Sequence, residues 1–121
     1  MRRVVLDTNA LMMPFQFGLN LDLELERLLG PHEVVVPKPV LDELASLAAR
    51  NIPARKALRL ARKYEIVDCE GRPDDVLVEL ARDHGMIVVS NDKSVISLLK
   101  EEGISHIRLK SRTHLILEES L

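Results

Sequence analysis

The sequence has 121 residues, of which 46% are hydrophobic and 30% charged, with a formal net charge of −2. This composition is typical of one globular domain, residues 1–121, and excludes a disordered chain and a strongly basic nucleic-acid coat protein. No apolar run approaches the roughly 18 residues of a membrane span, so no membrane partner is expected. The single cysteine, Cys69, cannot form a disulfide within the chain, which favours a reducing compartment and predicts a cytoplasmic protein.

Short β-branched runs alternate with segments of helical periodicity along the chain. Strands are expected at residues 3–6, 33–36, 65–68, 86–90 and 104–109, and helices at 21–29, 40–48, 53–61, 74–84 and 93–102. This order predicts the α/β class, a three-layer α/β/α domain with a central parallel sheet of about five strands. Residues 8–17 are not assigned to an element, and residues 114–117 could be a last strand.

Two acidic residues follow the ends of expected strands. Asp7 follows the first strand, and Asp92 lies two residues beyond Ser90, at the end of the strand at 86–90. Ligands of an open parallel sheet bind at the carboxyl ends of its strands, so both carboxylates are candidates for a functional site. Each could instead be a turn or helix-capping residue, and Asp92 directly precedes the helix that begins at Lys93.

Helical geometry places a third carboxylate. At about 100° per residue, the apolar face of the helix at 40–48 centres near Leu44. Asp42 then points into solvent, whereas Glu43 flanks the buried face and can reach inward. Glu43 could equally be an ordinary surface residue of a charged helix.

An acidic pair, Asp74 and Asp75, opens the helix that follows Pro73. Acids suit a helix N-terminus, where they can cap it and complement its dipole. If this pair meets Asp7, Glu43 and Asp92 at one edge of the sheet, the carboxylates repel one another unless a cation lies between them. Ligation by oxygen alone favours Mg²⁺ or Mn²⁺, ions that activate water and stabilise charge on a phosphodiester under attack.

These segments, in this order, resemble the PIN domain, a ribonuclease fold related to the flap-type 5′ nucleases. Four blocks carry the resemblance over nearly the whole chain: residues 4–9 (VVLDTN), residues 40–44 (VLDEL), Asp74-Asp75 with residues 81–85 (ARDHG), and residues 88–92 (VVSND). The resemblance implies a Mg²⁺- or Mn²⁺-dependent ribonuclease whose catalytic and metal-binding acids are Asp7, Glu43, Asp74 and Asp92. Asp74 is preferred over Asp75 because its distance to Ala81 fits the family spacing.

The resemblance also implies supporting residues and two branches of substrate. Thr8, Asn9 and Ser90 would be polar groups that orient the carboxylates. PIN nucleases include toxins of toxin–antitoxin pairs and nucleases of ribosomal RNA maturation in archaea and eukaryotes. The Asp74-Asp75 pair and the basic segment 108–112 make the chain more similar to the second branch, while the presence of an antitoxin or a ribosomal partner stays open.

Cationic residues offer a surface for an RNA backbone. Residues 55–63 contain five cations and no acid, and Arg55, Arg59 and Arg62 are spaced as one helical stripe. Five further cations could extend it: Lys38, Lys93, Arg108, Lys110 and Arg112. The stripe could also be the solvated face of an amphipathic helix. The resemblance further suggests a homodimer, for which residues 11–15 and 21–29 could supply an apolar patch, although a core role is equally consistent.

Three kinds of function are compatible with a strand-end aspartate. Besides the ribonuclease, the chain could be a catalytically silent RNA-binding scaffold or a small-molecule phosphatase. The phosphatase is weakened because Asp7-Thr8-Asn9 lacks the second acid of the D-x-D pattern. Nucleotide-dependent chemistry is poorly supported, because neither G-x-x-x-x-G-K-[ST] nor G-x-G-x-x-G occurs.

Overall fold

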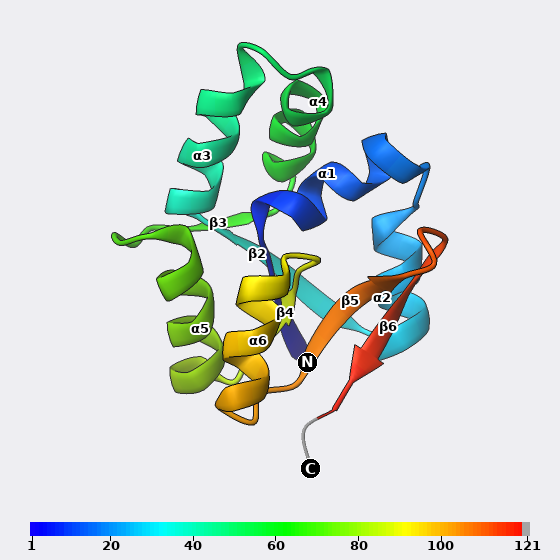
Figure 1. The fold of residues 1–121 in the computed structure, drawn as a ribbon, viewed down its shortest axis with the longest axis vertical. Coiled ribbons are helices and arrows are strands. Elements are labelled where there is room, and N and C mark those ends of the chain that lie inside the picture. Colours follow the sequence, from blue (N-terminus) through cyan, green and yellow to red (C-terminus); the bar gives the residue numbers. More distant parts are fainter. Residues whose placement is uncertain (120–121) are drawn as a thin grey trace.

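The computed structural model describes residues 1–119, which form a central sheet covered by helices on both faces (Figure 1). The strands are β1 (Arg2–Leu6), β2 (His32–Pro37), β3 (Glu65–Val67), β4 (Ile87–Val89), β5 (His106–Lys110) and β6 (His114–Glu118). The helices are α1 (Thr8–Phe17), α2 (Leu21–Leu29), α3 (Lys38–Ala48), α4 (Ile52–Ala61), α5 (Pro73–His84) and α6 (Lys93–Glu101). No helix within residues 1–119 is long and apolar enough to cross a membrane.

The strands lie in the order β3-β2-β1-β4-β5-β6, so β1 is central and the chain crosses over between β3 and β4. The first five strands are parallel, as expected, and β6 runs antiparallel to β5. Residues 114–117, expected as a possible last strand, thus belong to β6, which adds a sixth strand to the expected sheet of about five. The reason is local: Ser111 and Arg112 adopt positive φ angles of 55° and 60°, which turn the chain back into a hairpin.

Residues 8–17, which carried no expected element, form helix α1. The Asp7 side chain caps its first turn, and Gly18, in the left-handed region at φ 68°, ends it. Pro14 lies inside the helix. Because proline lacks a backbone N–H and is disfavoured in a helix interior, the sequence of this segment does not indicate a helix. Because Leu11, Met12 and Met13 are buried in the core, they do not belong to an apolar surface patch.

The hydrophobic core lies on both faces of the sheet. Val4 and Leu6 of β1 face α1–α4, whereas Val5 faces α5 and α6, as the alternation of side chains along a strand requires. A central parallel strand covered on both faces reads as a continuous apolar run, which is why residues 3–6 stand out in the sequence. The layers of α1–α4, sheet and α5–α6 confirm the three-layer prediction.

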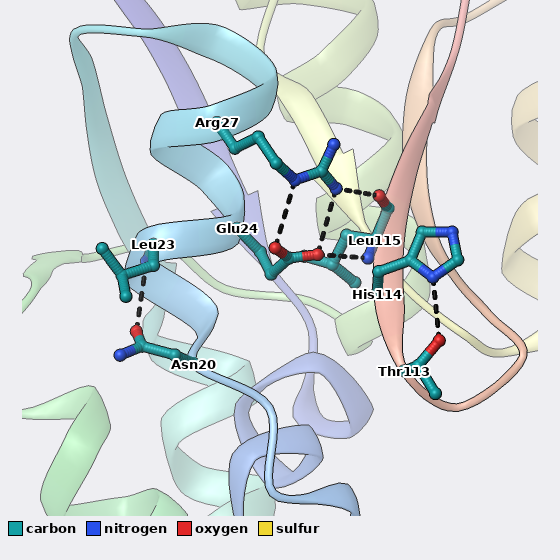
Figure 2. Close-up of polar contacts among 7 residues, drawn as sticks. All are labelled: Asn20, Leu23, Glu24, Arg27, Thr113, His114 and Leu115. Atoms are coloured by element: carbon teal, nitrogen blue, oxygen red, sulfur yellow. Dashed lines mark hydrogen bonds and ion pairs between the residues drawn. The ribbon is translucent and has the colours of Figure 1, made fainter.

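Helix α2 packs beside the outer strand β6 and supplies hydrogen-bond partners to its edge (Figure 2). The Arg27 guanidinium donates to the Leu115 carbonyl at 2.7 Å, and the Leu115 amide donates to the Glu24 carboxylate at 2.8 Å. Glu24 and Arg27 also bind each other at 3.0 and 3.2 Å. These two side chains thus occupy the backbone groups that a further strand would otherwise pair with.

Candidate active site

Asp7 lies at the carboxyl end of the central strand and is 5% exposed. One carboxylate oxygen accepts a hydrogen bond from the Ala10 amide at 2.7 Å and thereby caps α1. The other oxygen accepts a hydrogen bond from the Ser90 hydroxyl. Asp7 is therefore a helix cap and a buried carboxylate at the strand ends at the same time, so the capping and functional interpretations do not exclude each other.

Asp92 follows the neighbouring strand, because Leu6 of β1 pairs with Val89 of β4. The Ser90 hydroxyl accepts a hydrogen bond from the Asp92 amide at 3.1 Å, so one serine links both strand ends. The Asp92 carboxylate caps α6 by accepting hydrogen bonds from the Ser94 amide at 2.9 Å and the Ser94 hydroxyl at 2.7 Å.

Glu43 and Asp42 diverge on α3. Glu43 accepts a hydrogen bond from the Thr8 hydroxyl at the start of α1, whereas Asp42 pairs with Lys38 at 3.3 Å on the helix surface. The first turns of α1 and α5 and the middle of α3 meet at this edge of the sheet (Figure 1). Asp42 thus faces solvent and Glu43 faces inward, as helical geometry predicts from the sequence.

A cavity of about 300 Å³ brings the predicted acids together. Its lining includes all four preferred acids and two of the expected supporting residues: Asp7, Glu43, Asp74, Asp92, Thr8 and Asn9. Asp75 is exposed and does not line the cavity. The Asp74 carboxylate forms no hydrogen bond or ion pair with another described residue, so its oxygens are available to a ligand.

Burial and mutual repulsion alter the protonation of these carboxylates. Burial raises the pKa of Asp7 to about 7. The hydrogen bonds from Ser90 and Ala10 lower this pKa, whereas the nearby carboxylates of Asp92 and Asp74 raise it further. The pKa of Asp74 is raised by burial first and then by Asp92 and Glu43. The pKa of Asp92 is instead lowered, chiefly by the hydrogen bond from the Ser94 hydroxyl.

The donor chemistry of the cavity fits a hard divalent cation, since four carboxylates from four segments line it without histidine or cysteine. In their present side-chain conformations, however, residues 1–119 contain no group of three acidic, histidine or cysteine side chains placed to bind one metal ion. Glu43 is turned toward Thr8, and Asp92 toward Ser94. Ligation by three acids therefore requires side-chain rotation within the cavity.

The cations expected to contact RNA are spread over several elements and do not line this cavity. Arg55, Arg59 and Arg62 are exposed at α4, and Arg55 also donates to the Ala48 carbonyl at 3.2 Å. Lys93, Lys110 and Arg112 are exposed. Arg108 is half-buried and bound to Glu118 at 2.7 Å, so its guanidinium already has a partner within the β5–β6 hairpin.

Three residues of the lining are not among the predicted site residues: Leu47, Pro73 and Leu77. Leu47 lies four residues after Glu43, so helical spacing could have placed it on the same face. Arg72, just before α5, was also missed; its charge lowers the pKa of Asp74, against the larger raising effects of burial and neighbouring acids. An isolated arginine in a loop leaves no sequence pattern to find.

Comparisons with known proteins match nearly the whole chain to one family. A model of the family described as "PIN like domain" matches residues 4–112. Ribonuclease VapC4 of Methanocaldococcus jannaschii is 31% identical over 114 residues, which cover 86% of this chain and 87% of the relative. Ribonuclease VapC9 of Archaeoglobus fulgidus is 30% identical over an alignment 122 residues long, and the match covers 97% of this chain and 90% of the relative.

Solved structures share the fold at lower identity. The PIN domain endonuclease Utp24 superposes with a TM-score of 0.83 at 23% identity and covers 98% of this chain and 92% of its own. A domain of a functionally unknown protein from Methanocaldococcus jannaschii gives a TM-score of 0.63 at 16% identity, covering 92% and 93%. The matched family model and the two sequence relatives together show that this chain belongs to the PIN-like domain family.

Proposed function

We propose that the chain is a divalent-metal-dependent ribonuclease that hydrolyses RNA phosphodiester bonds and works in the cytoplasm. The observation that carries the proposal is the cavity in which Asp7, Glu43, Asp74 and Asp92 meet, at the carboxyl ends of β1 and β4. The names of the two sequence relatives, both ribonucleases, support the same activity.

Each acid would have a defined task in this reaction. Asp7 is held in place by Ser90 and the Ala10 amide, so it offers a fixed ligand position at the cavity floor. Glu43, Asp74 and Asp92 would complete the ligand set for Mg²⁺ or Mn²⁺. A bound cation of this kind supplies charge neutralisation and activates water for attack on a phosphodiester.

RNA would approach across the cationic face of α4. This helix packs against α1 and α3, the two helices that carry Thr8 and Glu43 (Figure 1). Arg55, Arg59 and Arg62 are exposed on α4 and its C-terminal cap. Backbone phosphates can follow such a stripe without sequence readout.

The first test is Mn²⁺ titration by calorimetry, together with cleavage of mixed RNA substrates, on wild type and Asp7→Asn. Wild type is expected to bind Mn²⁺ and cleave RNA, and Asp7→Asn to lose both while keeping its circular-dichroism spectrum. The pair Asp74→Asn and Asp75→Asn provides a matched control, because only Asp74 lines the cavity. Undiminished cleavage by purified Asp7→Asn would overturn the site assignment, and RNA binding without turnover in either metal would favour the scaffold function.

The same RNA cleavage could serve either ribosomal RNA maturation or a toxin. The comparisons include both VapC ribonucleases and the endonuclease Utp24, so they favour neither branch. The Asp74-Asp75 pair and segment 108–112 lead us to propose ribosomal RNA maturation over a toxin. Growth arrest on induced expression of wild type, but not of Asp7→Asn, would instead indicate a toxin.

A further inference from the structure

The cavity that holds the four carboxylates also has an apolar side, formed by Leu47, Pro73 and Leu77. Leu77 is fully buried in the core, whereas Leu47 is 41% exposed and belongs to neither core cluster. Leu47 is therefore an exposed aliphatic side chain that lines the same cavity as the four carboxylates.

Helix geometry places Leu47 next to the reacting position. Side chains four residues apart on a helix are neighbours, with Cβ atoms about 5–6 Å apart, so Leu47 lies beside Glu43 on one face of α3. A phosphodiester that reaches the carboxylates brings an attached ribose and base into the same cavity. The base is uncharged and has flat apolar faces that can pack on a side chain.

We propose that Leu47 is a positioning residue that packs against a nucleobase adjoining the cleaved bond. This inference rests on the proposed ribonuclease function and deepens it. Because leucine offers no hydrogen-bonding group, the contact tolerates any base, in contrast to readout by polar side chains. An aromatic platform is not available, because the only aromatic residues of the chain, Phe15, Phe17 and Tyr64, do not line the cavity.

The test compares Leu47→Ala with wild type on RNA oligonucleotides in which each nucleotide flanking the cleaved bond is made abasic in turn. At one abasic position we expect the KM of wild type to rise about fivefold, the loss that corresponds to part of one buried leucine side chain. Leu47→Ala should show the same rise on intact RNA and little further rise on the abasic substrate. The value of kcat should stay unchanged, because the lost contact stabilises the bound substrate and the transition state equally.

Leu98→Ala is the matched control, since Leu98 is 42% exposed on α6 and does not line the cavity. It should behave as wild type, and Leu47→Met should restore the KM. Equal KM values for Leu47→Ala and Leu98→Ala would overturn the role of Leu47. The same holds if the KM increases caused by Leu47→Ala and by the abasic position multiply, because the two changes would then act independently. A changed oligomeric state in Leu47→Ala would also overturn it, because the side chain would then belong to a contact between copies. Absence of cleavage by wild type would instead overturn the ribonuclease function itself.

Discussion

Asp7 combines a structural contact, the cap of α1, with a place in the lining of the proposed active site. Its two oxygens accept hydrogen bonds from the Ala10 amide and the Ser90 hydroxyl, so the carboxylate is fixed before any ligand arrives. Burial of this carboxylate raises its pKa to about 7, although the two hydrogen bonds act in the opposite direction. The charged form of Asp7 is therefore destabilised, and a bound cation would stabilise it; a perturbed pKa of this kind is typical of functional carboxylates.

This destabilisation of the charged form predicts a specific pH dependence for the metal-free protein. The folded-state pKa of Asp7 is raised from 3.8 to about 7, so the stability that its proton confers is complete below pH 4 and is lost as the pH rises through 7. The difference corresponds to about 4 kcal/mol above pH 7 as an upper bound. In Asp7→Asn the amide oxygen can still accept from the Ala10 amide, whereas the NH2 group would donate to the Ser90 hydroxyl oxygen instead of accepting from it. Because the variant carries no charge, it should be more stable than wild type at pH 8 and similar to it at pH 4.

Urea unfolding at both pH values in the presence of a chelator checks this expectation. A stability difference between Asp7→Asn and wild type that is the same at pH 4 and pH 8 would contradict it. Saturating Mn²⁺ should reverse the order at pH 8, because only wild type gains binding free energy on folding.

At the scale of elements, the contact between α2 and β6 acts as a substitute strand. Glu24 and Arg27 reproduce the acceptor and donor that a neighbouring backbone would present to Leu115 (Figure 2). We expect Glu24→Ala to expose the Leu115 amide and raise its hydrogen-exchange rate about tenfold, since one charge-assisted hydrogen bond is lost. Arg82→Ala, which removes a surface ion pair with Asp83 elsewhere, is the control and should leave that amide unchanged.

Helix α4 is the second element with a testable surface. Replacing Arg55, Arg59 and Arg62 together by alanine should weaken RNA binding and reduce the slope of log K against log salt by about 2, since each phosphate contact to a single strand contributes roughly 0.7. Lys100→Ala on α6 should leave the slope unchanged. Equal slopes for the triple variant and wild type would identify the stripe as a solvated face only.

At the scale of the molecule, one sheet joins both core clusters, because consecutive residues of β1 point into opposite clusters. The protein should therefore unfold in a single transition. Tyr64 packs against the cluster on the α1–α4 side, so its fluorescence reports that half, while far-ultraviolet circular dichroism reports the whole. Separate midpoints for the two signals would contradict the expectation of one domain.

We keep the homodimer as a proposal, but the fold reduces the apolar surface that could form its interface. Of the expected patch, Leu11, Met12 and Met13 belong to the core, and only Phe15 remains exposed there, with Leu23 exposed on α2. These two are the large apolar side chains of the expected patch that are exposed and available to a dimer contact. Light scattering on wild type and Phe15→Ser tests it: a monomeric mass for wild type would end the proposal.

The sequence by itself determined the fold class, the order of parallel strands and helices, and the candidate acids, because these depend on local periodicity and on the rule that strand ends gather at one edge. It could also separate Glu43 from Asp42, since helix geometry alone decides which side chain turns inward. Residues 8–17 escaped prediction because Pro14 interrupts the local signal, whereas the helix is held by capping at Asp7 and by burial of Leu11.

Only the tertiary structure decided which residues share the cavity. That Ser90 binds Asp7, that Thr8 binds Glu43, and that Asp74 rather than Asp75 lines the cavity all depend on contacts between segments far apart in the chain. The exposure of Leu47 was decided in the same way: helical spacing places this residue on the face of Glu43, but its exposure follows only from how α3 packs against α4 and α5. Local periodicity determines which way a side chain turns, but long-range packing determines what it meets.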